Sequence, residues 1–445
     1  MRCPQSLLLG ILSAGLACGH GAGPARAAET GDPTLAEIKA QNQALQQQVQ
    51  KQQQEIDELR QRLDALAAPV ARPEPAPRPV APEPAGPVRL ESTALRAARE
   101  IRVSGEVGLG YFKSGPDGTS PNGEFRVDDA RVFLEAPVWK NAYFFTGLEL
   151  MTRETGDGNL HFGELYADFE DLLTGSRDER LSLRIGRFNV PFGEEYQVRS
   201  VMTDPLIMHS VADIWGIDNG LEIYGTLGRF QYNLAVQNGG QNSLTHDYNQ
   251  DKSVTARLSL EPVKGLHLSG SFHRTGKLDA KNDFFSNIWF GGGFFGALGP
   301  AATTRTFQAT LYEFDAAWQW ATGRAQATAG TAQFSDDNPA ADDSRRLQYG
   351  GLEVVQQVNE KFYAAARYSE VRAAEGYPLV GLGDFGEYYF GSPTVRLHRL
   401  SLGLGYRFAE ALTWKIEYSL ENGRLINGAT RGGENMFSTE VGLKF

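Results

Sequence analysis

Apolar and polar residues alternate along most of the chain after residue 100, a pattern typical of strands with one apolar and one polar face. The alternation divides residues 100–445 into sixteen segments. Each is about ten to fifteen residues long, near the length that a tilted strand needs to cross a bilayer. The expected strands are 100–112, 124–136, 141–153, 160–170, 180–189, 218–227, 230–238, 252–261, 266–275, 306–320, 325–335, 345–357, 362–372, 394–408, 412–422 and 433–445.

The connections between these segments alternate in length. Long connections such as 190–217 and 373–393 alternate with mostly short ones such as 137–140 and 228–229. A membrane barrel has one rim of tight turns and one rim of long loops, whereas a soluble sandwich has no reason for this asymmetry. The pattern therefore predicts an all-β fold, a sixteen-stranded antiparallel transmembrane β-barrel.

The parity of the side chains separates a lipid face from a lumen face. One parity of the last strands is apolar, with aromatic residues at its ends: Leu400, Leu402, Leu404, Tyr406 and Phe408, then Leu412, Trp414, Ile416, Tyr418 and Leu420. The opposite parity carries Arg399, Ser401, Arg407, Thr413, Lys415, Glu417 and Glu421. Charges on the inner face are tolerable only if water fills the lumen.

The stretch from Leu181 to Trp215 joins one alternating strand to a long irregular loop. Val190 and Pro191 end the strand, because proline has no N–H to donate. We interpret the stretch as barrel wall followed by pore constriction. The candidate constriction residues are Glu194, Glu195, Arg199, Asp204, His209 and Asp213. The alternative is that these are ordinary solvated loop charges.

The N-terminal 27 residues have the features of a secretory signal peptide. Arg2 precedes an apolar run, and Ala25-Arg26-Ala27 matches a cleavage site. Both cysteines, Cys3 and Cys18, fall within this segment, so a mature chain without it would have no thiol chemistry. An alternative is lipid attachment at Cys18.

Residues 33–68 repeat apolar positions every three and four residues through five heptads, which predicts a parallel coiled coil. Asn42 and Gln52 occupy two of the core positions, where polar residues fix register. A single amphipathic helix or a disordered segment are the alternatives. Residues 69–99 are rich in proline at first, and we interpret them as a semi-rigid linker between the coiled coil and the barrel at 100–445.

Several motifs together resemble a known family. They are Gly186-Arg-Phe-Asn-Val-Pro-Phe-Gly193, the block from Phe125 to Leu150 with its ARVFLEAPVW core, GLEIYGTLGRFQYNLAVQNG at 220–239, and the terminal Phe445. In this order they resemble the phosphate-selective porin family, O and P type, over most of residues 100–445. The resemblance implies an outer-membrane barrel, usually a homotrimer, with its third long loop folded inward. Where the family often has a lysine after the aromatic residue of the motif, this chain has Asn189.

Anion selectivity requires an excess of cations along the lumen. Parity predicts that the lumen cations are Arg102, Arg131, Arg184, Arg257, Arg367, Arg399, Arg407 and Lys415. Carboxylates occur on the same faces, among them Glu106, Asp129, Glu149, Asp168, Glu222, Glu353 and Glu417. Residues 100–445 contain 32 Lys and Arg against 44 Asp and Glu. We therefore expect a general or weakly selective channel rather than a dedicated phosphate channel.

The sequence predicts no enzyme, cofactor or metal site and no nucleic-acid partner. Gly381 to Gly386 matches G-x-G-x-x-G without a surrounding βαβ unit, and His267 with Ser269 is placed inside the lumen. Two functional hypotheses follow. The chain is a porin in the outer membrane of a Gram-negative bacterium that passes small hydrophilic solutes or anions such as phosphate. Alternatively, it is a structural protein whose periplasmic coiled coil tethers that membrane to peptidoglycan.

Overall fold

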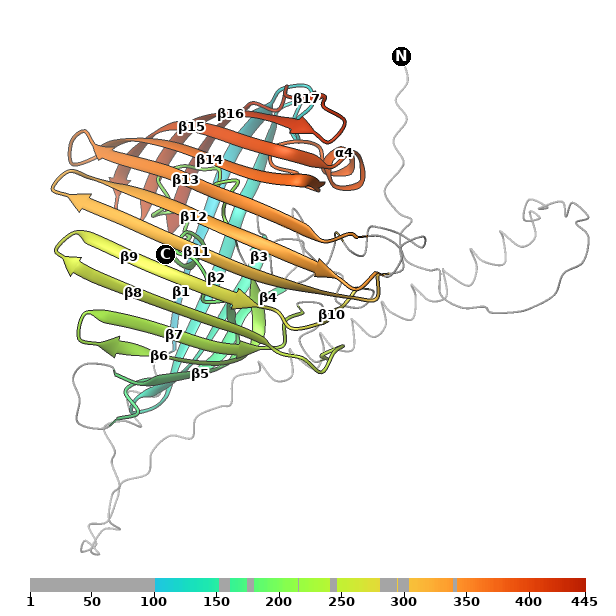
Figure 1. Cartoon of the computed structure of the whole chain (residues 1–445). Coiled ribbons are helices and arrows are strands. Elements are labelled where there is room, and N and C mark those ends of the chain that lie inside the picture. The colour runs from blue at the N-terminus through green and yellow to red at the C-terminus, as the bar shows by residue number, and fades with distance from the viewer. Residues whose placement is uncertain are drawn as a thin grey trace, which may run out of the picture. The chain divides into compact units, whose positions relative to one another are not determined.

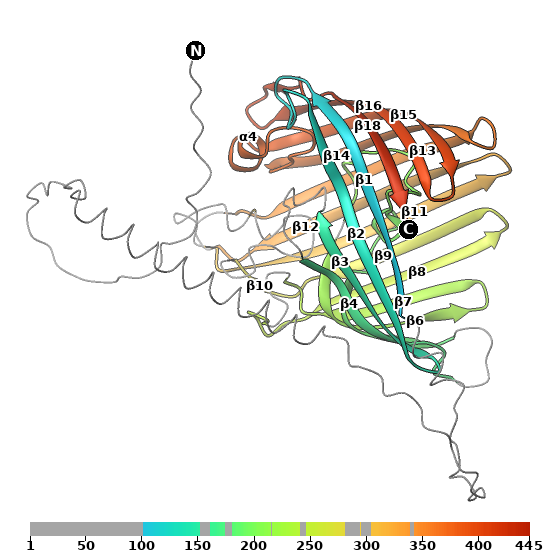
Figure 2. The same cartoon turned by 180° about the vertical axis from the view of Figure 1, so that it is seen from behind.

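The computed structural model describes residues 101–445 except 152–160, 174–179, 215, 241–245, 281–293, 295–303 and 339–341. These residues form one antiparallel sheet that closes into a barrel (Figures 1 and 2). Its strands are β1 (Arg102–Ser114), β2 (Glu124–Trp139), β3 (Ala142–Met151), β4 (His161–Phe169), β5 (Ser182–Asn189), β6 (Ile217–Leu227), β7 (Phe230–Gln237), β8 (Ser253–Val263), β9 (Leu266–Arg274), β10 (Leu278–Asp279), β11 (Thr306–Trp320), β12 (Gly323–Asp336), β13 (Arg345–Gln357), β14 (Phe362–Tyr377), β15 (Thr394–Ala409), β16 (Leu412–Leu425), β17 (Thr430–Arg431) and β18 (Met436–Lys444).

Sixteen of these strands form the barrel wall, and the two-residue strands β10 and β17 extend its edge locally. The predicted all-β, sixteen-stranded antiparallel barrel is therefore confirmed. Every predicted segment overlaps one long strand, and the largest difference is β14, which continues to Tyr377. The predictions for residues 1–27, 33–68 and 69–99 lie outside the described residues.

The wall closes where the first and last strands pair. β1 pairs with both β2 and β18, so the long strands leave no unpaired edge. At one end of this seam Gly105 and Phe445 exchange two backbone hydrogen bonds, each 3.0 Å from N to O. Closure satisfies backbone groups that lipid could not satisfy.

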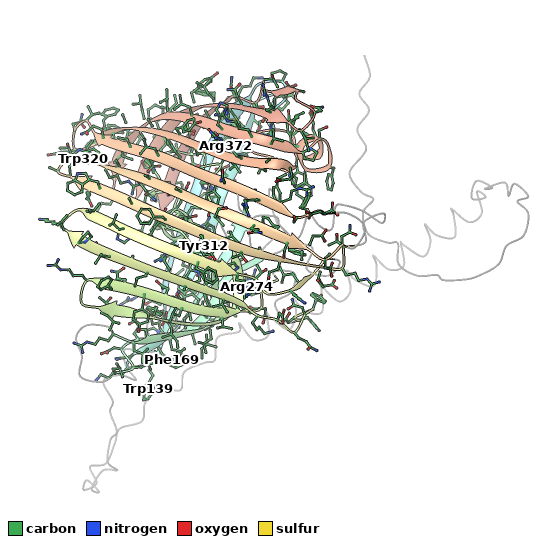
Figure 3. The ribbon with its side chains drawn as sticks, viewed as in Figure 1. Trp139, Phe169, Arg274, Tyr312, Trp320 and Arg372 are labelled. Atoms are coloured by element: carbon green, nitrogen blue, oxygen red, sulfur yellow. The ribbon has the colours of Figure 1, made fainter. Side chains whose placement is uncertain are left out.

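Turn chemistry explains why one rim is tight. Gly228, in the two-residue connection between β6 and β7, has a φ of 67°, a conformation that favours glycine. Trp139 and Trp320 end β2 and β11 beside such short connections, and they lie at the short-turn rim while Tyr312 lies further along the wall (Figure 3). Aromatic side chains at a rim suit a membrane–water interface.

The two faces of the wall differ as parity predicts. Leu402 and Leu404 on β15 are 50% and 54% exposed on the outer face. Ser401 on the same strand and Glu417 on the paired strand β16 are buried on the inner face. Within the described residues, no helix is both long and apolar enough to cross a membrane.

We expect Gly105→Val to weaken closure of the barrel. A side chain at position 105 would collide with the Phe445 ring and with the backbone carbonyl of Arg131. Such overpacking costs about 1–3 kcal/mol of folding free energy. The check is the temperature at which the folded band is lost in electrophoresis in SDS. Gly270→Val is the control, because a Cβ at Gly270 meets nothing within 4 Å, and equal stability of the two variants would contradict this account.

Candidate functional site in the barrel lumen

The chain between β5 and β6 turns into the lumen. Gly193, just after the end of β5, has a φ of 69° and lies so close to the Glu313 carboxylate that a side chain there would collide with it. Glycine is therefore needed at this turn. The loop then runs along the inner wall through the 3₁₀ turn at Tyr196–Val198. The predicted inward fold of this loop is confirmed for its described residues.

Apolar side chains hold the loop against the wall. Phe192 and Val211 belong to a buried cluster with Leu311 on β11 and Phe334 on β12. Further along the loop, Ile207 and Met208 pack in a second cluster with Phe112 and Met436, and Leu206 packs in a third with Val355, Tyr363 and Ala365. The loop thus covers an apolar part of the inner wall that would otherwise face water.

Polar side chains of the wall bind the backbone of the loop. Glu417 on β16 accepts hydrogen bonds from the N–H groups of Ile207 and Met208, the latter at 2.9 Å. Ser369 Oγ on β14 accepts from Val211 N, and Ser271 Oγ on β9 accepts from Gly193 N, both at 3.1 Å. These contacts satisfy loop donors that are buried away from bulk water.

Three of the predicted lumen arginines also hold the loop. Arg257 on β8 donates to the Gly193 carbonyl at 2.9 Å. Arg367 on β14 donates to the Met208 carbonyl at 2.7 Å, and Arg399 on β15 donates to the His209 carbonyl at 2.6 Å. These side chains face the inside of the barrel, where their contacts position the loop.

Carboxylates pair with the lumen cations. Arg367 Nε lies 2.9 Å from Glu353, and Arg399 Nε lies 2.7 Å from Glu421. Lys415 Nζ lies 3.0 Å from Glu440.

The same holds for the cations of β2 and β5. Arg131 Nη2 on β2 lies 3.1 Å from Asp129, and Arg184 on β5 lies 3.0 Å from both Asp168 and Glu222. Arg407, by contrast, is exposed near the short-turn end, where its guanidinium lies 4.8 Å from the centroid of the Tyr363 ring. The described lumen therefore presents ion pairs on several strands instead of a ladder of cations alone.

The loop candidates divide into buried and accessible groups. Arg199 and Asp213 form an ion pair in which both side chains are buried. Glu194 lies 3.2 Å from His267 Nε2, and Glu195 accepts a hydrogen bond from Ser210 N at 3.0 Å. Both glutamates keep part of their surface exposed, so they remain candidates for the constriction.

Burial alters the protonation of the loop carboxylate Asp204. Together with Glu195 and Arg367 it lines a small polar cavity of about 40 Å³ between the loop and the wall. Burial raises the pKa of Asp204 to about 6, although Lys415 and Arg367 act in the opposite direction. His209 Nε2 lies 4.0 Å from the carboxylate. This group therefore changes charge near physiological pH.

A row of aromatic rings on the inner face of β2 to β6 was not predicted. Phe133 on β2, Phe145 on β3 and Tyr166 on β4 stack in sequence, with ring centroids 6.1 and 5.0 Å apart. The Arg184 guanidinium continues the row, 4.4 Å from the Tyr166 centroid and 5.2 Å from that of Tyr224 on β6. We call these five residues the aromatic row.

The row was not recognised in the sequence because β2 and β3 carry aromatic or large apolar residues on both faces. Phe144 is 37% exposed on the outer face, while its neighbour Phe145 points inward. Strict parity counted along β2 and β3 would have given the assignment. Tyr143 and Tyr224, whose hydroxyls both donate to Asp168, fall on the same inward parity as Phe145 and Glu222.

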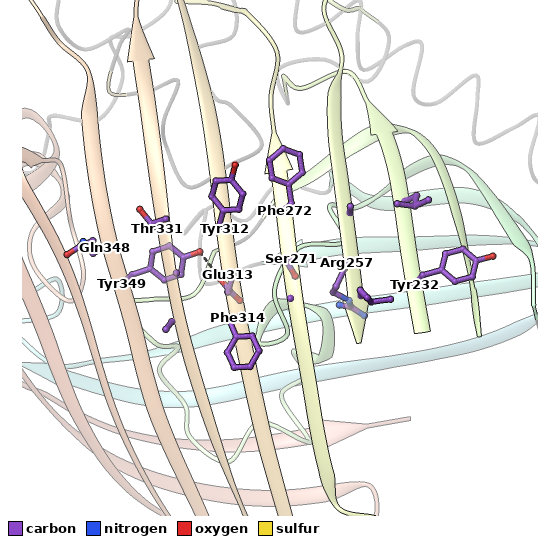
Figure 4. A pocket seen from close by; sticks show the side chains of 16 residues that line it. Tyr232, Arg257, Ser271, Phe272, Tyr312, Glu313, Phe314, Thr331, Gln348 and Tyr349 are labelled. Carbon is purple, nitrogen blue, oxygen red and sulfur yellow. Dashed lines mark hydrogen bonds between the residues drawn. The ribbon is translucent and has the colours of Figure 1, made fainter. Parts of the chain in front are cut away.

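A larger cavity, of about 780 Å³, lies mainly on the outer face of β7–β13. Tyr232, Phe272, Tyr312 and Phe314 are among the residues that line it (Figure 4). The lining also includes the small residue Gly270. On the inner side, Tyr349 donates to Glu313 at 2.8 Å (dashed in Figure 4). Because most of its lining faces outward, this cavity is separate from the path through the lumen.

Comparison with known proteins shows which solved structures have a similar fold. No protein-family profile and no curated protein matches the sequence. Among solved structures, the outer membrane channel DcaP of Acinetobacter baumannii is similar with a TM-score of 0.51 and 11% identity, over 78% of this chain and 97% of that one. The in-vitro folded outer membrane protein OmpT of Vibrio cholerae is similar with a TM-score of 0.50 and 10% identity, over 78% and 97%. The chain shares the fold of these outer-membrane proteins.

At these identities the likeness establishes the fold alone, so the phosphate-selective family remains a prediction from the sequence motifs. A trimeric form of Vibrio cholerae OmpT is also similar, with a TM-score of 0.50 and 10% identity, over 78% of this chain and 99% of that one. In the part of the chain that the structure describes, no three His, Cys, Asp or Glu side chains group so as to hold a metal ion.

We expect Glu417→Ala to release the central part of the loop. The substitution removes the acceptor for two buried N–H groups, each of which costs about 1–3 kcal/mol when left unsatisfied. Amide hydrogen exchange at residues 206–209 should accelerate while exchange in the strands stays slow. Glu417→Gln keeps an acceptor oxygen and should behave nearly as the native protein; equal protection in Glu417→Ala would contradict the anchoring role.

Proposed function

We propose that this chain is an outer-membrane porin that allows small hydrophilic solutes or ions to diffuse passively through a water-filled lumen narrowed by the loop at 190–217. The observation that carries the proposal is the inward loop, bound by wall side chains from β8 to β16. A polar, charged inner face inside an apolar outer face suits water within and lipid without. The fold shared with an outer membrane channel is consistent with this.

The pairing of lumen charges supports weak selectivity over a dedicated phosphate site. A cation attracts anions strongly only if its field is not cancelled by a carboxylate nearby. Arg184 has two carboxylate partners, and Arg367 and Arg399 have one each at hydrogen-bond distance. We therefore propose a general channel, with phosphate among the solutes that pass.

The location and assembly are part of the same proposal. The barrel would lie in the outer membrane of a Gram-negative bacterium as a homotrimer, with the coiled coil in the periplasm. The second candidate, a tether to peptidoglycan, rests on the five heptads of residues 33–68. A tether does not need an open lumen, so conductance separates the two functions.

Reconstitution of the purified full chain in a planar bilayer tests the proposal. We expect a steady conductance proportional to salt concentration and a permeability ratio of K⁺ to Cl⁻ within about threefold of unity, because paired charges cancel much of their field. Phosphate should carry current without saturable block. Deletion of residues 196–210 should raise the conductance. No conductance would favour the tether, and saturable block by phosphate would favour the phosphate-selective assignment.

The conductance should also depend on pH through Asp204. Its carboxylate is charged above a pKa of about 6 and neutral below it, so acidification removes one negative charge from the loop. The permeability ratio of K⁺ to Cl⁻ should therefore fall as the pH drops from 7.5 to 5. The charged groups around it are Lys415, Arg367, Arg199, Glu195 and His209.

Reversal potentials across a KCl gradient measure this dependence. In Asp204→Asn the permeability ratio of K⁺ to Cl⁻ at pH 7.5 should already be near the low-pH value of the native protein. The step in this ratio near pH 6 should therefore be smaller than in the native protein. His209→Gln is the control, because it removes the titration of the histidine and leaves that of the carboxylate. A step of unchanged size in Asp204→Asn would show that other groups cause it.

A further inference from the structure

The aromatic row spans five consecutive strands, with one residue from each of β2 to β6. It continues without a gap from Phe133 through Phe145, Tyr166 and Arg184 to Tyr224, and each neighbouring pair lies within 6.1 Å. Phe133, Phe145 and Tyr224 are only partly buried, and the register places them inside the barrel. Tyr166 is buried between its neighbours, so the lumen has ring surface on either side of it, at Phe133 and Phe145 and at Tyr224.

The polar groups of the aromatic row and its surroundings are bound to one another. Asp168 is fully buried and accepts hydrogen bonds from Tyr143 Oη at 3.3 Å, Tyr224 Oη at 2.7 Å and Arg184 Nε at 3.0 Å. Glu222, also buried, accepts from Arg184 Nη1 at 3.0 Å. Two carboxylates thus offset the single guanidinium, and what the row offers to the lumen is chiefly ring carbon without net positive charge.

The side chains named above that bind the loop backbone belong to other strands. Arg257, Ser369 and Glu417 lie on β8, β14 and β16, outside β2–β6. Phe145 is the fourth residue of β3, and β3 begins directly after a short turn. The row therefore borders the passage on its short-turn side.

We propose that the aromatic row is a binding subsite for uncharged sugars, which deepens the proposed porin function and rests on it. A pyranose ring has an apolar C–H face that packs against aromatic side chains, and its hydroxyls remain in contact with lumen water. Binding sites for small molecules combine such apolar surface with a few fixed polar groups, here those around Asp168. An anion gains little, because the charge of Arg184 is already compensated.

Binding of cellobiose to the full chain in detergent, measured by saturation-transfer NMR, tests the subsite without requiring conductance. Sorbitol is the comparison solute, since it has similar hydroxyls but no ring face. We expect saturable cellobiose binding and a half-saturating concentration at least about fivefold higher in Phe145→Ala. Phe145→Leu should lose binding to a similar degree while it preserves side-chain volume and folding.

Phe144→Ala is the matched control, because it removes the same side chain from the adjacent, outward-facing position. It should bind cellobiose as the native protein does. Equal binding of sorbitol and cellobiose, or equal effects of Phe144→Ala and Phe145→Ala, would overturn the subsite. Conductance without sugar binding overturns the subsite alone, and sugar binding without conductance overturns the porin function alone.

Discussion

The pairing of β1 with β18 is the interaction on which the rest of the structure depends. A sheet in an apolar medium must leave no unpaired edge, because unsatisfied backbone groups there cost several kcal/mol each. Closure fixes an inside and an outside, and from that point every residue of a strand faces one or the other. The polar parity of β15 and β16 can then be buried, as Ser401, Glu417 and Glu421 are, because it faces the lumen.

Closure also creates a lumen in which charged side chains need partners. Arg367 and Arg399 each pair with a carboxylate and in addition donate to a loop carbonyl. The guanidinium is suited to this double use, because its several donors point in fixed directions. A lysine ladder could attract anions in the same positions, yet it would not hold the loop with the same geometry. The wall charges thus serve first to position the loop.

The sequence predicted the barrel wall well because the alternation of apolar and polar residues along a strand shows which side chains face outward and which face inward. Period-2 alternation and short turns located all sixteen long strands, and parity placed Arg184 and Arg367 inside. For the loop, the sequence predicted only that it folds into the barrel, and it did not predict which wall residues the loop contacts. The bond from Val211 N to Ser369 Oγ joins residues 158 positions apart, and no local pattern encodes such a contact. The aromatic row was not predicted because Phe144 and Phe145 place aromatic rings on both faces of β3.

Two parts of the inner wall consequently differ in chemistry. The strands that bind the loop use charged and hydroxyl side chains, and these become less available to a solute because they bind loop backbone. Strands β2–β6 satisfy polar groups within the wall, through Asp168 and Glu222, and leave ring surface toward the lumen. In the proposed channel, a solute would meet both loop carboxylates such as Glu194 and aromatic carbon. Under the proposal of a sugar subsite, discrimination between solutes would depend on whether a molecule has an apolar face as well as hydroxyl groups, and net charge would be a secondary criterion.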